Sequence, residues 1–256
     1  MADPRTTAAK LAAQLRRTFG GGLRSVVLFG SVPRGEAIPG VSDLNVLVLL
    51  ESLAPADLAR AAPLMQDWIR HGNTPPHLYS SDEWAGMADT FAIEMADMQD
   101  AREVLAGTDP ITAGSVTNSD LRIHTEQEIR ETMLHLRLRL LLGANSSEEV
   151  GNLLLSGLPS FTAYMRAALR LNGEAPPQDS RTVIELASRV IDADPRPMLD
   201  CWQTRRTLRR LAVPITDPLV EDYTAFTRRL VTYLDQAPNA DPLRVDAAAR
   251  PVPAHH

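Results

Sequence analysis

Residues 28–50 read LFGSVPRGEAIPGVSDLNVLVLL. A Gly-Ser pair follows one apolar run, and a Ser-Asp-Leu-Asn cluster opens the next. Continuous apolar runs of this length are typical of strands that are covered on both faces. The sequence therefore predicts two buried strands, over residues 25–29 and 44–50, joined by a polar segment that carries candidate site residues.

The first part of this polar segment has the composition of a phosphate site. Gly30 and Ser31 end the first strand, and Pro33 suits the first turn of a helix. The free N–H groups of a helix N-terminus, beside a serine hydroxyl, would bind phosphate. Arg34 would add a charge-assisted contact, because a planar guanidinium binds oxyanions in pairs. We therefore predict nucleotide binding by Gly30, Ser31 and Arg34.

The second part offers a candidate metal site. Asp43 begins the next predicted strand, and Asn45 shares its face because strand side chains alternate. Two carboxylates at these positions would hold a divalent metal against nucleotide phosphates. Asn45, however, supplies one neutral carbonyl oxygen in place of a charged, bridging carboxylate.

Glu94 is the candidate for a further acid. It lies in the apolar segment TFAIEMAD, for which we predict a strand over residues 91–96. A carboxylate in an apolar strand is costly unless it is paired or bound to metal. Glu94 is therefore predicted as a metal ligand or as the general base for an attacking hydroxyl. A partly exposed strand carboxylate paired with an arginine is the alternative, and Asp97 would point to the opposite strand face.

These motifs resemble a known superfamily. Gly30-Ser31-x-x-Arg34-Gly35, followed by Ser42-Asp43-Leu44 and an apolar strand, is similar to the signature of the DNA polymerase β-like nucleotidyltransferases. The small bacterial members and the aminoglycoside nucleotidyltransferases are the nearest group. The segment FAIEMADMQDAREVLAGTDP also resembles the one that carries their third acid. The specific resemblance spans residues 24–110.

The resemblance implies a mixed sheet with flanking helices, two Mg²⁺ ions, and transfer of a nucleoside monophosphate from ATP or another nucleoside triphosphate to a hydroxyl. By position, Gly30 and Ser31 would hold phosphate, Asp43 would bind metal and Glu94 would be the third acid. Asn45 departs from this pattern, because the family has a second Asp there. Glu36 is a candidate to replace the missing acid.

Beyond this region the chain changes character. Helices are predicted over residues 55–70, with a kink or split at Pro63, and over 101–106, with a short strand over 76–80. A turn-rich linker over 107–119 precedes a helical half. Its helices are predicted over 121–142, 147–157, 160–172, 180–193, 197–211 and 218–236. We therefore predict an α/β domain over 1–112, an all-α helical-bundle domain over 118–237, and a disordered tail over 238–256.

Composition narrows the class of protein. The chain has 256 residues and a formal net charge of −6, which disfavours nucleic acid as a partner. Cys201 is its only cysteine, so an intrachain disulfide is excluded, and a buried thiol in a helix is expected. No apolar run is long enough to span a bilayer. We expect a cytoplasmic protein without membrane contact; an oligomer is left open.

Two functions remain open at this point. One is a Mg²⁺-dependent nucleotidyltransferase acting on a hydroxyl of a small molecule or a protein. The other is a catalytically degenerate relative that acts as a nucleotide-binding or regulatory partner, including an antitoxin-like role, and Asn45 favours it. The arginine run at 205, 206, 209 and 210 is interpreted as a solvated or interdomain face, with phosphate binding as the alternative.

Overall fold

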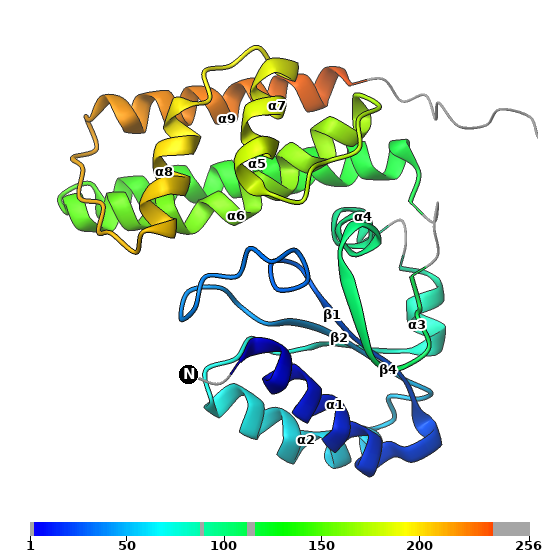
Figure 1. The fold of residues 1–256 in the computed structure, drawn as a ribbon. Helices are drawn as coiled ribbons and strands as arrows, with labels where there is room; N and C mark the ends of the chain where they lie inside the picture. Colours follow the sequence, from blue (N-terminus) through cyan, green and yellow to red (C-terminus); the bar gives the residue numbers. More distant parts are fainter. Residues whose placement is uncertain (1–2, 88–89, 112–115, 238–256) are drawn as a thin grey trace, which may run out of the picture.

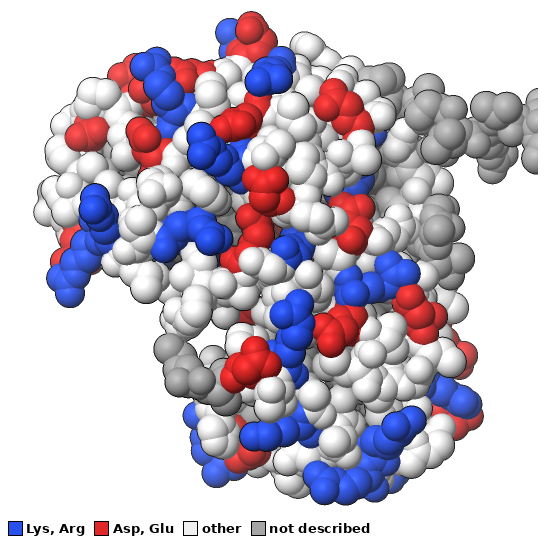
Figure 2. All heavy atoms as spheres, in the orientation of Figure 1, with Lys and Arg blue, Asp and Glu red and all other residues white. Residues whose placement is uncertain are grey.

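The protein folds into a sheet-containing lobe and a helical lobe (Figure 1). The structure, a computed structural model, describes residues 3–87, 90–111 and 116–237. The predicted tail over 238–256 lies outside these residues, as does part of the predicted linker. The architecture confirms the predicted fold class of a mixed sheet with flanking helices followed by helices alone. On the face drawn in Figure 2, basic and acidic side chains are interspersed over both lobes.

Four strands form the sheet, and their order is β3-β2-β1-β4. The strands are β1 (Leu23–Phe29), β2 (Asn45–Leu50), β3 (His77–Ser80) and β4 (Arg102–Gly107). β1 is antiparallel to both β2 and β4, whereas β2 and β3 run parallel, so the sheet is mixed. The two apolar runs in the opening stretch are thus the central strands.

Helices cover both faces of the sheet, which explains the continuous apolar runs. Val26 and Val48 face one side, where they pack with α1 (Pro4–Phe19) and α2 (Pro55–Arg70). Val27 and Leu47 face the other side, where they pack with α4 (Ala92–Asp100). Figure 1 shows α4 on the side of the sheet nearer the helical lobe, with α1 and α2 on the far side.

The segment around Glu94 is where the sequence-based prediction is wrong. Residues 91–96 were predicted as a strand, but they lie mostly in helix α4. The apolar side chains of α4 are buried on several sides, against both the sheet and the helical core. A helix that is buried all round shows no 3.6-residue hydrophobic period, so its sequence resembles a buried strand.

The next segment shows the reverse error. Residues 101–106 were predicted as a helix, but 102–107 form edge strand β4, paired with β1 from Ser25↔Gly107 to Phe29↔Arg102. At Gly107 a β-carbon would lie 1.9 Å from the backbone oxygen of Arg24. The glycine therefore permits a close approach of two backbones rather than ending a helix. Strand pairing overrode the local helix propensity.

Two prolines interrupt helices less than predicted. Helix α2 continues through Pro63, and one helix, α6 (Ser147–Leu171), runs through Pro159 where two helices were predicted. Buried side chains on both sides of Pro159, including Leu154 and Phe161, hold the two halves of α6 in one core. Tertiary packing therefore offsets the lost backbone hydrogen bond.

The helical lobe packs around α6. The other helices are α5 (Asn118–Gly143), α7 (Ser180–Val190), α8 (Arg196–Arg206) and α9 (Pro218–Gln236). Short α3 (Ser81–Ala85) and a 3-10 turn (Gly20–Gly22) complete the fold. Cys201 of α8 is fully buried, as expected. In the described part of the chain, we find no helix with the length and apolar character needed to cross a membrane.

Candidate functional site

A cavity of about 410 Å³ lies between the loops at one end of the sheet and helices α6 and α8. Every residue that the sequence singled out for nucleotide or metal binding lines it: Gly30, Ser31, Arg34, Asp43, Asn45 and Glu94. The helical lobe contributes the opposite wall, including Arg166, Trp202 and Arg205. Both lobes therefore build one cavity.

The segment after β1 is a turn and not the start of a helix. Gly30 and Gly35 have φ angles of +81° and +74°, and the Glu36 amide donates to the Ser31 carbonyl at 2.9 Å. These left-handed residues favour glycine and bracket a single turn, so the predicted helix at Pro33 does not form. Ser31 still lines the cavity.

Asn45 closes the strand end of this turn. It pairs with Phe29 across the β1–β2 ladder, as the first residue of β2. A β-carbon on Gly30 would lie 2.8 Å from the Asn45 Nδ2 atom, so the side-chain amide is packed against the Gly30 backbone. Asp43 lies two residues before β2 and not in the predicted strand, but it lines the same cavity.

Glu94 is the most unusual carboxylate of the cavity. It lies in the first turn of α4, and its Oε2 atom is buried without a hydrogen-bond partner. Burial raises its pKa, while His124 and His77 act in the opposite direction. The Nδ1 atom of His124, on the neighbouring helix α5, is also buried without a partner. A carboxylate with a raised pKa and a free oxygen has the properties of a general base.

Asp97 lies one helical turn after Glu94 and lines the same cavity, which corrects its predicted opposite placement. Its carboxylate lies 3.3 Å from the guanidinium of Arg34 and 3.4 Å from that of Arg170 on α6. Arg34 also donates to the Asp97 backbone oxygen at 3.1 Å, and only 4% of its side chain is exposed. Arg34 therefore connects the turn after β1 to α4.

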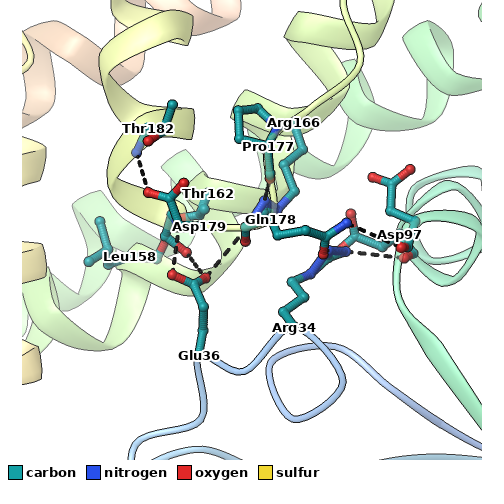
Figure 3. A network of polar contacts seen from close by, with 12 residues as sticks. Arg34, Glu36, Asp97, Leu158, Thr162, Arg166, Pro177, Gln178, Asp179 and Thr182 are labelled. Atoms are coloured by element: carbon teal, nitrogen blue, oxygen red, sulfur yellow. Dashed lines mark hydrogen bonds and ion pairs between the residues drawn. The ribbon is translucent and has the colours of Figure 1, made fainter.

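Glu36 connects the same turn to the helical lobe. Its carboxylate accepts hydrogen bonds from the Ser180 amide at 2.7 Å and from the Ser180 hydroxyl. The Arg166 guanidinium of α6 lies 3.7 Å away and donates to the Pro177 and Gln178 carbonyls. Figure 3 shows Glu36 and Arg34 extending from the loop toward the helical lobe and toward Asp97. Glu36 is thus committed to interdomain contacts.

Arg205 and Arg206, at the end of α8, line the cavity from the helical side. Neither has a carboxylate or carbonyl hydrogen-bond partner among the described residues. The Arg206 guanidinium lies over the Trp202 ring, 5.6 Å from its centroid. Arg205 is half-buried, which lowers its pKa, and the nearby Asp43 charge counteracts this. The arginine run was visible in the sequence, but its place in the cavity required the tertiary structure.

The residues present must also be compared with the metal that the resemblance implies. Asp43 and Glu94 offer carboxylates, and Asn45 offers one carbonyl oxygen. Within residues 3–87, 90–111 and 116–237, no three His, Cys, Asp or Glu side chains group closely enough to hold a metal ion. Mg²⁺ bound by one or two carboxylates and substrate phosphates fits this set. A two-ion centre fits it less well, because two closely spaced cations need more negative charge and Asn45 supplies none.

Comparison with known proteins supports the fold. No family model matches the sequence, and neither does any curated protein. Among solved structures, spectinomycin adenyltransferase AAD(9) from Enterococcus faecialis, crystallised with ATP and spectinomycin, is similar with a TM-score of 0.59. The match covers 91% of this chain and 99% of that chain, at 13% sequence identity. The chain shares its fold with an adenyltransferase. At this identity the likeness shows the fold alone, so the activity must be inferred from the residues of the site.

Proposed function

We propose that this protein is a nucleotidyltransferase that moves a nucleoside monophosphate from a nucleoside triphosphate, ATP being the first candidate, to a hydroxyl of a small molecule or protein. The observation that carries the proposal is the shared cavity, in which the Gly30-Ser31 turn, Asp43 and Glu94 face a wall that contains Arg205 and Arg206. The fold shared with an ATP-bound adenyltransferase supports it.

The roles follow from the chemistry of each side chain. The Gly30-Ser31 turn offers backbone N–H groups and a hydroxyl to phosphate oxygens. Asp43 would hold one Mg²⁺ ion, which would neutralise phosphate charge when bound. Arg34, whose guanidinium is engaged by Asp97, would position the turn instead of contacting the nucleotide as the sequence suggested.

Glu94 would act as the general base. Its free oxygen would take the proton of the acceptor hydroxyl as the hydroxyl oxygen attacks the α-phosphorus, and pyrophosphate would leave with the electron pair of the broken P–O bond. Burial raises the pKa of Glu94, which makes its carboxylate a stronger base toward the acceptor proton. Trp202, Leu158 and Ala163 provide an apolar wall of the same cavity for the acceptor or the base.

Calorimetric titration with ATP and Mg²⁺ tests the binding half of the proposal. We expect the wild-type protein to bind ATP, and Asp43→Asn to weaken the binding at least about tenfold. Asp67→Asn, an exposed aspartate on α2, is the matched control and should bind like wild type. Absence of ATP binding by the folded wild-type protein would contradict the proposal.

Transfer is tested separately, by pyrophosphate release from ATP with a panel of hydroxylated acceptors. Asn45 favours a second candidate function, in which the protein binds the nucleotide and signals its presence without transferring it. Both candidates predict ATP binding. They differ in pyrophosphate release, which only an enzyme shows and which Glu94→Gln should then strongly reduce.

A further inference from the structure

Two of the four acidic side chains of the cavity are already paired with arginines. Asp97 is paired with Arg34 and Arg170, and Glu36 is held by Ser180 and Arg166. A carboxylate that neutralises a buried guanidinium cannot leave it without stranding that charge. Glu36 is therefore not available to replace the carboxylate missing at position 45.

Asp43 and Glu94 are the acids that remain. The Asn45 amide nitrogen is packed against Gly30, so this side chain can offer no more than its one neutral oxygen. The Asp43 carboxylate and the phosphates of a nucleotide suffice for one Mg²⁺ ion, and Glu94 would serve as the general base for the acceptor hydroxyl. A second ion would have no negative side chain to hold it within the described part of the cavity.

The basic side chains of the cavity also differ in whether they have an acidic partner. Arg34 and Arg166 are paired with carboxylates, whereas Arg205 and Arg206 line the cavity with no acidic partner within hydrogen-bond distance among the described residues. Trp202 restrains Arg206 by stacking, and Arg205 lies near enough to Asp43 to interact with its charge. Guanidinium groups on a cavity wall without an acidic partner, such as those of half-buried Arg205 and exposed Arg206, are suited to bind an oxyanion.

Among the described residues, the cavity thus has too few carboxylates for a second cation and two arginines without a hydrogen-bonded acidic partner. We propose that the protein takes up its nucleoside triphosphate with a single Mg²⁺ ion, and that Arg205 and Arg206 supply the positive charge that a second ion would otherwise bring. The proposal rests on the proposed function, since it concerns the same nucleotide. Guanidinium groups fixed to α8 bind phosphate oxygens directly and need no bridging carboxylate.

The experiment is a set of calorimetric titrations with ATP at several free Mg²⁺ concentrations, all high enough to convert ATP to its Mg²⁺ complex. Under these conditions, any remaining dependence of the ATP affinity on the free Mg²⁺ concentration reports the binding of ions beyond the one already bound to ATP. We expect no dependence for wild type. For Asn45→Asp we expect a slope of about one in log affinity against log Mg²⁺ concentration.

The arginines are tested in the same titrations. Arg205→Gln and Arg206→Gln should each lower the affinity for Mg²⁺-ATP at least about tenfold, the loss of one charge-assisted contact. Arg209→Gln is the matched control, because Arg209 belongs to the same run but does not line the cavity. Circular dichroism and thermal unfolding confirm that each variant is folded.

The outcomes separate this proposal from the proposed function. A slope of about one for wild type, or arginine variants that bind like the Arg209→Gln control, would overturn the single-ion proposal while leaving nucleotide binding intact. An Asn45→Asp variant without Mg²⁺ dependence would show that residue 45 does not limit the number of ions, and so would overturn it as well. Failure of folded wild-type protein to bind ATP at all would contradict both.

Discussion

The Asn45 Nδ2 atom lies 2.8 Å from the place where a β-carbon on Gly30 would stand. The first residue of β2 is thus packed directly on the turn that follows β1. Gly30 also has a φ of +81°, so the absence of a side chain both permits this backbone conformation and leaves room for the Asn45 amide. The geometry of the candidate phosphate turn therefore depends on a residue of the neighbouring strand.

Replacing this glycine should affect both stability and binding. We expect Gly30→Ala to lower the free energy of unfolding by about 1–3 kcal/mol, because alanine is strained at positive φ, and to weaken ATP binding by displacing Asn45. Urea unfolding and calorimetry measure the two effects. Gly72→Ala is the control, since Gly72 has the same φ of +81° with no atom near its β-carbon position. It should lose stability only, and equal ATP binding by the two variants would contradict the expectation.

The Glu94 carboxylate should lower the thermal stability of the protein but be needed for pyrophosphate release. Glu94→Gln removes a buried charge whose Oε2 atom has no partner, so we expect a higher melting temperature than wild type at neutral pH. Loss of the general base should reduce pyrophosphate release by about 10²–10⁴-fold. Glu221→Gln, in the first turn of α9, is the matched control and should not change pyrophosphate release. A less stable but fully active Glu94→Gln variant would contradict this role.

The ion pair between Arg34 and Asp97 should contribute more than a surface pair. Arg34→Met removes a guanidinium that is 4% exposed and that also donates to the Asp97 backbone oxygen. We expect a loss of about 1–3 kcal/mol in the free energy of unfolding, because a buried acceptor is left without its partner. The exposed pair of Arg181 with Glu185 is the comparison. Arg181→Met should lower the free energy of unfolding by at most about 0.5 kcal/mol. Equal losses for the two variants would contradict the expected effect of burial.

Cys201 provides a prediction for the effect of pH. Its complete burial raises the pKa of the thiol to about 12. The folded state therefore disfavours the thiolate, and the stability associated with this group is present below its unfolded pKa of about 8.5 and is lost as pH rises above it. Denaturant titrations between pH 7 and about pH 10 should show this loss in wild type and less of it in Cys201→Ala.

Thiol reactivity gives an independent check of the same burial. The chain has one cysteine, so the reaction with a chromophoric disulfide reports a single site. We expect no measurable reaction in the native state and one thiol per chain in denaturant. Rapid labelling of the native protein at neutral pH would contradict the burial of Cys201.

The elements with a clear pattern were predictable from the sequence alone. The central strands, the capped helices of the second half and the two-part architecture follow from apolar runs, hydrophobic periods and turn residues, which are local signals. The segment over 91–107 was not predictable, because both its helix and its strand are determined by their neighbours. The apolar residues of α4 are buried against both the sheet and the helical core, and β4 is a strand because it pairs with β1.

The candidate site divides in the same way. The sequence by itself determined which chemical groups are present: a Gly-Ser turn, one aspartate, an asparagine where a second carboxylate is absent, a glutamate in an apolar segment, and a run of arginines. Only the tertiary structure decided which of them are free to act. Arg34 and Glu36 are engaged by Asp97, Ser180 and Arg166, whereas Arg205 and Arg206 line the cavity wall with no hydrogen-bonded carboxylate among the described residues. Charge pairing between residues far apart in the chain depends on distances in space, and a linear sequence does not contain those distances.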